Sequence, residues 1–313
     1  MLAFLLSSGN ATGVASAASR AAQDEHLKVP KGEIVVKFPA ATLPVRREVL
    51  IESVKTAAHA VSNYYGRFPV RHLTVDIKLR DTSHPLFASE HLGESIRVQL
   101  GTTATAAHLE HNWVMTHEMV HLAFPDLEQR YSWIEEGLAT YLEPIARAQV
   151  GQIPVEDVWS DLVERLPEGF PHAGSGGLND GGNYARIYWG GALYWFLADL
   201  EIREETHNKK GIQDVLVGVL NRGGDGSRHW EVEKFLKVAK EIIGLDTFRE
   251  LYLRLGSKPE TVELKGIWEK LGVSKVGKKW VFDDKAPLAS IRRSMTGAEK
   301  ATGVPPTNRT ARP

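Results

Sequence analysis

The sequence of 313 residues contains no cysteine, which excludes disulfide bonds, thiolate metal ligands and a cysteine nucleophile. His, Asp and Glu are the strong metal ligands that remain. No stretch reaches the roughly 18 consecutive apolar residues of a membrane-spanning helix. Lys and Arg number 38 against 39 for Asp and Glu, and this balance argues against a nucleic acid as the main partner. Any chemistry should therefore lie in histidines and carboxylates.

The two ends of the chain differ in composition from its middle. Residues 1–30 are rich in Ala, Ser and Gly, and we expect a leader or a disordered tail there. An apolar start followed by Ala15-Ser16-Ala17 resembles the later part of a secretory signal, which favours export over a cytoplasmic location. Residues 284–313 are polar and are expected to be a disordered tail. Residues 31–283 remain as the folded region.

The most informative stretch is His117-Glu118-Met119-Val120-His121, an H-E-x-x-H pattern in an apolar run. On a helix, residues four apart share a face, so His117 and His121 can bind one metal ion. Glu118 lies at the rim of that face, where it can act as general base on a water molecule. The alternative is a helix with two surface histidines. The apolar surroundings favour the metal site, because buried imidazoles need partners.

A second pattern follows, with Trp133, two variable residues, Glu136 and a glycine. Together the two patterns resemble the gluzincins, zinc peptidases of the peptidase MA-like group that includes the glycyl aminopeptidase and aminopeptidase N branches. The resemblance implies that Glu136 is the third ligand of one Zn²⁺ ion, with the fourth position open. From the residues alone, Glu136 would be an ordinary exposed glutamate, and Glu135 competes with it. Pro125 predicts a tight connection between the two helices, because it ends the first one.

The stretch from Tyr188 to Ala192, followed by Asp199-Leu200-Glu201-Ile202-Arg203, is similar to a region of glycyl aminopeptidase-like gluzincins. There a tyrosine hydroxyl stabilises the oxyanion, and the resemblance implies this role for Tyr188. Tyr184 is the alternative. Gly190 stands where those relatives often have lysine. From the residues alone, this would be an aromatic core helix.

The secondary-structure patterns fit the same resemblance. We expect a strand at 32–38, a helix from Pro44 to Gly66, and half-buried strands at 72–79 and 95–100. The helix that carries the first motif is expected to begin near Thr103 or Thr105. Further helices are expected at 154–166, 185–204, 212–220, 232–242 and 247–255.

The resemblance implies an α+β fold of the thermolysin-like two-lobed type. A small mixed sheet with helices would form the N-lobe, at about 31–124, and a mostly helical lobe would span about 125–283. In that family an edge strand pairs with the substrate backbone, which would be 95–100 here. An ordinary edge strand is the alternative.

The function implied by the resemblance is zinc-dependent hydrolysis of a peptide or protein substrate, with Glu118 as general base. One alternative is a binding or scaffold module that keeps the metal and the fold without the activity. Another is a zinc hydrolase of a non-peptide substrate. The sequence at His108-Leu109-Glu110-His111 only faintly resembles the amine-binding motif of aminopeptidases, and it lies too close to His117. This difference argues against exopeptidase activity, and nothing predicts an oligomeric state.

Overall fold

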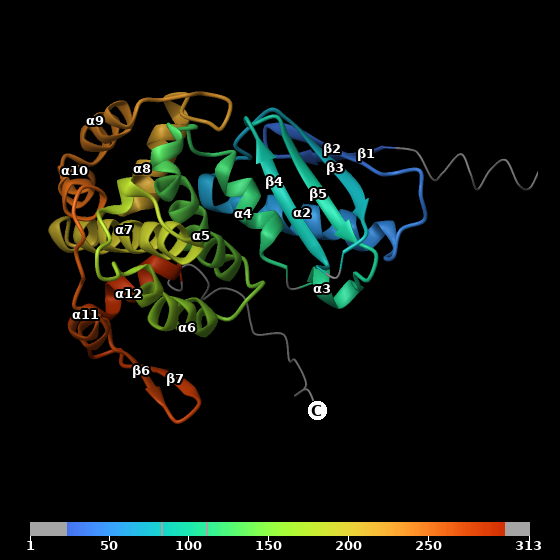
Figure 1. Ribbon diagram of the computed structural model, residues 1–313. Coiled ribbons are helices and arrows are strands. Elements are labelled where there is room, and N and C mark those ends of the chain that lie inside the picture. The colour runs from blue at the N-terminus through green and yellow to red at the C-terminus, as the bar shows by residue number, and fades with distance from the viewer. Residues whose placement is uncertain (1–23, 83, 111, 298–313) are drawn as a thin grey trace, which may run out of the picture.

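The computed structural model describes residues 24–82, 84–110 and 112–297, and it has the expected α+β architecture in two parts (Figure 1). The first part holds a mixed sheet in the order β1-β2-β3-β5-β4. Its strands are β1 (Glu25–Val29), β2 (Gly32–Lys37), β3 (His72–Arg80), β4 (Leu86–His91) and β5 (Ser95–Gly101). The helices of this part are α2 (Arg47–Tyr65), α3 (Ala106–Glu110) and α4 (Val114–His121).

The sheet forms where apolar residues alternate with polar ones. Leu73, Val75 and Ile77 of β3 are buried on one face, as the period of two predicts. Strands β2, β3 and β5 run parallel, while β1 and β4 are antiparallel to their neighbours. Helix α2 connects β2 to β3 and ends at Gly66, whose φ of 73° favours glycine. The strands predicted at 32–38, 72–79 and 95–100 and the helix ending at Gly66 are therefore confirmed.

The assignment of the edge strand was wrong. Strand β5 lies between β3 and β4, so residues 95–100 are not at the edge of the sheet. The edge next to the metal motif is β4, which the sequence pattern did not reveal because Ser89, Glu90 and His91 interrupt its apolar residues. The opposite edge is β1, so the expected tail is also wrong for residues 25–29. Residues 1–23 lie outside the described part of the chain.

The helix of the first motif also begins later than predicted. Thr105 does start a helix, since its hydroxyl accepts a hydrogen bond from the His108 N–H at 3.4 Å, but this is the short α3. Helix α4 begins separately at Val114, whose N–H donates to the Asn112 side chain at 2.8 Å. Asn is suited to this because its side chain competes with helical hydrogen bonds. The break gives the metal motif a helix of its own.

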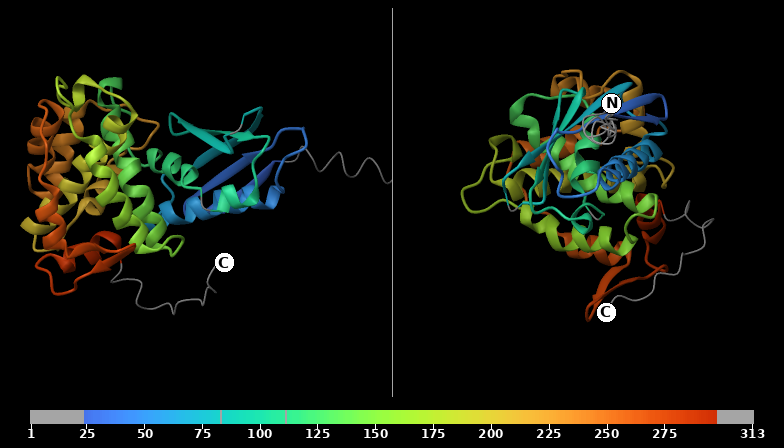
Figure 2. Two further views of the ribbon diagram at one scale, coloured as in Figure 1. Left: turned by 60° about the horizontal axis from the view of Figure 1, so that its bottom comes forward. Right: turned by 90° about the vertical axis from the view of Figure 1, so that its right-hand side faces the viewer.

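The second part is mostly helical, and Figure 2 shows it beside the sheet-bearing part. Its helices are α5 (Ser132–Gln149), α6 (Val155–Arg165), α7 (Tyr184–Glu205), α8 (Ile212–Asn221), α9 (Val232–Ile243), α10 (Thr247–Leu251), α11 (Leu264–Leu271) and α12 (Ala289–Thr296). A small hairpin, β6 (Val273–Val276) with β7 (Lys279–Phe282), precedes α12. Aromatic rings of Phe124, Trp195 and Phe235 pack 5.0–5.8 Å apart in the core. The helices predicted after residue 153 are confirmed, although the last one ends at Leu251 in a π-helical turn.

The expected disordered C-terminal tail is wrong for residues 284–297. Helix α12 buries Ile291 and Met295, which are four residues apart and so share a face. The buried Arg292 guanidinium donates to the Leu271 carbonyl at 2.7 Å and fixes the helix to α11. Residues 298–313 lie outside the described part. Within that part, no helix is long and apolar enough to cross a membrane.

Candidate metal centre and active site

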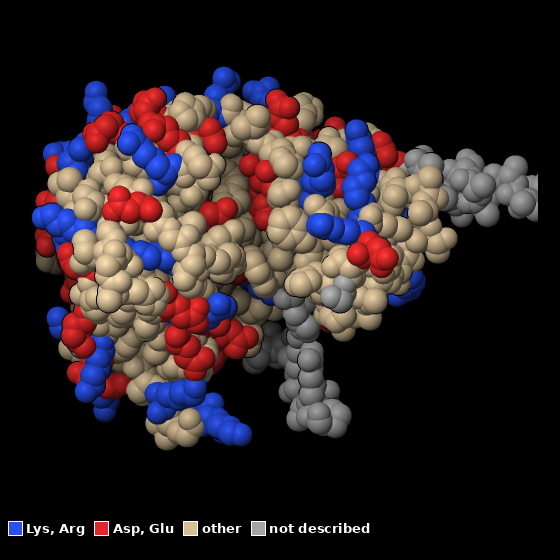
Figure 3. All heavy atoms as spheres, in the orientation of Figure 1, with Lys and Arg blue, Asp and Glu red and all other residues tan. Residues whose placement is uncertain are grey.

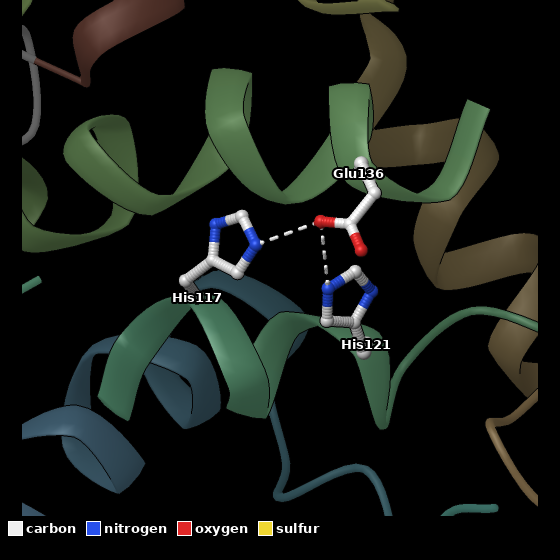
Figure 4. A group of neighbouring side chains, drawn as sticks. All are labelled: His117, His121 and Glu136. Atoms are coloured by element: carbon white, nitrogen blue, oxygen red, sulfur yellow. Dashed lines mark hydrogen bonds and ion pairs between the residues drawn. The ribbon is translucent and has the colours of Figure 1, made fainter. Parts of the chain in front are cut away.

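Helices α4 and α5 bring His117, His121 and Glu136 together (Figure 4). Nε2 of His117 lies 3.1 Å from Oε2 of Glu136, and Nε2 of His121 lies 3.6 Å from the same oxygen. Around a tetrahedral Zn²⁺ ion with bonds of about 2.0–2.2 Å, neighbouring ligand atoms lie about 3.3–3.5 Å apart. The three donors and their spacing therefore fit zinc. Two imidazoles and one carboxylate are also a common donor set of catalytic zinc.

The second ring nitrogen of His117, Nδ1, leaves Nε2 as the candidate metal ligand. The Nδ1 atom is buried and has no hydrogen-bond partner among the described residues. Nε2 is therefore the nitrogen directed at the other two ligand candidates, as Figure 4 shows. In the described part of the chain, these three residues form the one group of His, Asp or Glu side chains close enough to hold a metal ion.

The charges of the cluster are strongly coupled. Burial opposes a charge on His121, but the hydrogen bond and attraction to Glu136 outweigh it and raise the pKa of His121 to about 9. Burial would raise the pKa of Glu136, but hydrogen bonds from His117 and His121 hold it well below its ordinary value. The carboxylate is thus ionised and directed at a position that favours positive charge.

Glu135, the competing candidate, faces a different partner. Its Oε1 atom accepts a hydrogen bond from the Leu127 N–H at 3.1 Å. Burial raises the pKa of Glu135 to about 8, although His121 opposes this rise. Glu135 therefore stabilises the segment that connects α4 to α5, whereas Glu136 lies beside the two histidines.

Two glycines explain how Glu136 is positioned. A Cβ atom on Gly137 would collide with the backbone of Gly191, and one on Gly191 would collide with the Trp133 carbonyl. Helices α5 and α7 can therefore cross in backbone contact only where both lack side chains. The crossing places Glu136, next to Gly137, close to Tyr188, three residues before Gly191. This is the physical role of the glycine in the W-x-x-E-G pattern.

Glu118 reaches the edge of the sheet. Its Oε2 atom accepts a hydrogen bond from the Glu90 backbone N–H of β4 at 2.7 Å. The side chain is largely buried, and its charge influences both His121 and Tyr188. Glu118 thus lies between the edge strand and the candidate metal ligands, within reach of a water molecule that a metal ion there would bind.

Tyr188 is the tyrosine nearest the cluster. Its ring stacks on His117 with centroids 5.8 Å apart, and its hydroxyl lies close enough to the Glu136 carboxylate for the two to interact. Burial and the Glu136 carboxylate hold the pKa of Tyr188 well above its ordinary value, so the hydroxyl stays protonated. Tyr184 stacks on Tyr188 at 3.9 Å and is 56% exposed. In the described part, no hydrogen bond joins Tyr184 to the cluster.

The sequence analysis missed Glu90. Its carboxyl group lies close enough to His121 and Glu118 to feel both charges, and burial raises its pKa to about 7. The alternation of Leu86, Ala88 and Glu90 on one face of β4 was the signal that could have found it. The exposed His108 and Glu110 lie in α3 outside the metal cluster, as expected; His111 is not described.

Comparisons with known proteins show which solved structures have a similar fold. No protein-family model matches the sequence, and no curated protein matches it. Among solved structures, an aminopeptidase N family protein from Idiomarina loihiensis matches with a TM-score of 0.62 and 15% identity, over 80% of this chain and 49% of that one. An M1 zinc metallopeptidase from Deinococcus radiodurans matches with a TM-score of 0.48 and 18% identity, over 77% and 54%. This chain spans about half the length of these structures, and it has the two-lobed fold of the aminopeptidase N family protein.

Proposed function

We propose that this protein is a zinc-dependent peptidase of the gluzincin type, with His117, His121 and Glu136 as the metal ligands. The observation that carries the proposal is the convergence of these three donor atoms at tetrahedral spacing beside Glu118. A Zn²⁺ ion held there would supply Lewis-acid polarisation and a more acidic water molecule. The likeness in fold to an aminopeptidase N family protein supports the same reaction class.

Two residues of the chain move or hold protons in this proposal. Glu118 accepts a proton from the attacking water and later donates it to the leaving amine. Its hydrogen bond to the Glu90 N–H keeps the carboxylate oriented before the substrate arrives. Tyr188 donates a hydrogen bond to the oxygen of the scissile carbonyl, on which negative charge develops. Its raised pKa suits this role, because the hydroxyl must remain protonated.

The edge strand β4 provides the surface for a peptide backbone. The Glu90 N–H points away from β5 and toward Glu118. In an antiparallel pair, the N–H and C=O groups two residues earlier point the same way, so those of Ala88 face the open edge. An extended peptide can add to this edge as a further strand. Its scissile bond would then lie above the metal ligands.

The experiment is a scan of a proteome-derived peptide library by mass spectrometry. Zinc-loaded protein would be compared with Glu118→Gln, a chelated sample and the control Glu204→Gln, which removes an exposed carboxylate of α7. We expect Glu118→Gln to lower the cleavage rate roughly 10²–10⁴-fold, the usual contribution of a general base. It should retain about one zinc per chain, and Glu204→Gln should cleave like the parent protein.

Two outcomes would contradict the proposal. Cleavage that survives in Glu118→Gln would contradict the role of Glu118 as general base, and cleavage that survives under chelation would contradict a metal-dependent reaction. An intact library after incubation with zinc-loaded protein would instead favour a binding module with this fold. If products form, their termini decide between cleavage inside a peptide and removal of terminal residues.

A further inference from the structure

A pocket of about 140 Å³ opens beside His117 and Tyr188. This volume is several times what one water molecule requires. The pocket is bounded by the start of α4 and by α5, α6 and α7. Because it adjoins both the metal cluster and the candidate oxyanion donor, a substrate bound at the metal would extend a side chain into it.

Aromatic rings form the entrance of the pocket. Trp113 packs edge-on against His117, with ring centroids 5.3 Å apart, and is still 43% exposed. Tyr184, which stacks on Tyr188, is 56% exposed. Large exposed aromatic side chains on either side of a pocket mark a binding surface. Their ring faces attract cations as well as the apolar stem of a long side chain.

Four charged side chains line the pocket: Glu143 and Arg147 are buried, whereas Asp161 and Arg165 are exposed. Three of the four have partners. The buried Arg147 guanidinium pairs with Glu143 at 2.6 Å. Arg165 lies 4.5 Å over the Trp189 ring and pairs with Glu168 at 3.4 Å. In the part of the chain that the structure describes, no hydrogen bond or ion pair joins the remaining charge, Asp161 of α6. Asp161 is therefore the lining charge without a hydrogen-bonded partner, although Arg165 and Arg147 attract it through space.

The position of Asp161 makes a cation favourable there. Loss of hydration raises the pKa of its carboxyl, although Arg165 opposes this rise. A positive group in the pocket would offset that cost. Arg165 over Trp189 also demonstrates that this pocket accommodates a cation against an aromatic face. Acidic side chains gather along the hollow between the two parts of the molecule in Figure 3, which would attract basic peptides.

We propose that this pocket binds a lysine or arginine side chain of the peptide substrate next to the scissile bond, with Asp161 as its counter-ion and Trp113 and Tyr184 as its walls. The inference rests on the proposed peptidase function. It adds a specificity for basic residues that the metal motif does not imply. Asp161 acts through binding and takes no part in the bond-breaking step.

The test measures binding separately from cleavage. Zinc-loaded Glu118→Gln protein would be titrated by calorimetry with hexapeptides of alanine that carry one Lys, Arg, Leu or Glu. Such peptides can shift along the cleft until the variable residue enters the pocket. We expect the Lys and Arg peptides to bind about tenfold more tightly than the Leu peptide, or about 1.4 kcal/mol. In the background of Asp161→Asn this ratio should fall to about one.

A matched control is Asp157→Asn, the same change one turn earlier on α6, at an exposed residue that does not line the pocket. It should keep the tenfold ratio. Reversal of the charge in Asp161→Lys should make the Glu peptide the tightest binder. Equal affinities for Lys and Leu peptides in the parent background, or a ratio that survives in Asp161→Asn, would overturn the inference. A basic preference in binding, together with an intact peptide library, would support the pocket and contradict the peptidase.

Discussion

Two clusters of polar side chains connect α5 to α7, and they differ in how their charges are balanced. In one, the buried Asp199 accepts hydrogen bonds from the Tyr141 hydroxyl at 3.0 Å, Arg203 Nε at 2.8 Å and the Ile212 N–H at 3.0 Å. In the other, Nε2 of His117 lies 3.1 Å from Glu136 Oε2, Nε2 of His121 lies 3.6 Å from the same oxygen, and Tyr188 lies beside them. The Asp199 side chain is 3% exposed, whereas that of Glu136 is 28% exposed.

This difference in charge balance and exposure indicates that the Asp199 cluster has a structural role. Asp199 has a permanently charged partner in Arg203, and its donors come from three helices, so it fixes α5, α7 and α8 in one arrangement. Glu136 is balanced by two histidines, which carry a charge only when protonated, and a metal ion can replace such a proton. The first cluster is complete without any ligand. The second could hold a cation in place of that proton, which is expected of a functional site.

The largest effect on stability should come from Asp199→Ala. It leaves the Arg203 charge and the Tyr141 hydroxyl buried without their acceptor, which costs about 3–5 kcal/mol of unfolding free energy. Glu136→Ala should cost less than about 1 kcal/mol in metal-free protein, because His121 can lose its proton and the site is partly exposed. Urea unfolding of both variants measures the difference. If Asp199→Ala fails to fold, the milder Asp199→Asn should still cost more than Glu136→Ala; equal losses would contradict the comparison.

The second test concerns rate. Tyr188→Phe removes the hydroxyl that we propose as the oxyanion donor, and we expect kcat to fall about 10²–10³-fold. Unfolding free energy should change little. The control is Tyr65→Phe, which removes a buried hydroxyl of α2 without a hydrogen-bond partner among the described residues. This control should cleave peptides at the parent rate. A Tyr188→Phe protein with full activity would remove Tyr188 from the mechanism.

Features of the site that depend on residue spacing within one helix could be predicted from the sequence. His117 and His121 share a face because they are four residues apart, and the W-x-x-E-G pattern identified Glu136 only through its resemblance to known peptidases. Contacts set by the order of strands or by the crossing of helices could not be predicted. The pairing of Glu118 with the β4 edge depends on a strand too short and too polar to recognise, and the pocket at Asp161 depends on four separate helices.

The smallest expected effect is on the pH dependence of stability, and it concerns a third carboxylate, Glu90. Glu90, unlike Asp199, forms no ion pair in the described part, and burial raises its pKa from 4.5 to about 7 although His121 opposes this rise. Between pH 5 and 7 the folded protein therefore holds a proton that the unfolded chain has released, so its unfolding free energy falls as pH rises. Glu90→Gln cannot titrate and still accepts the hydrogen bond from the Gly93 N–H.

In metal-free protein, Glu90→Gln should match the parent near pH 4.5 and exceed its unfolding free energy by about 1–2 kcal/mol at pH 8. Urea unfolding across this range measures the difference. Glu94→Gln, at an exposed neighbour, should follow the parent curve throughout. Parallel curves for parent and Glu90→Gln would mean that the Glu90 carboxyl is already ionised at pH 5. The edge strand would then carry a negative charge beside the candidate metal ligands from pH 5 upward, and Glu90 would add to the acidic field around the site.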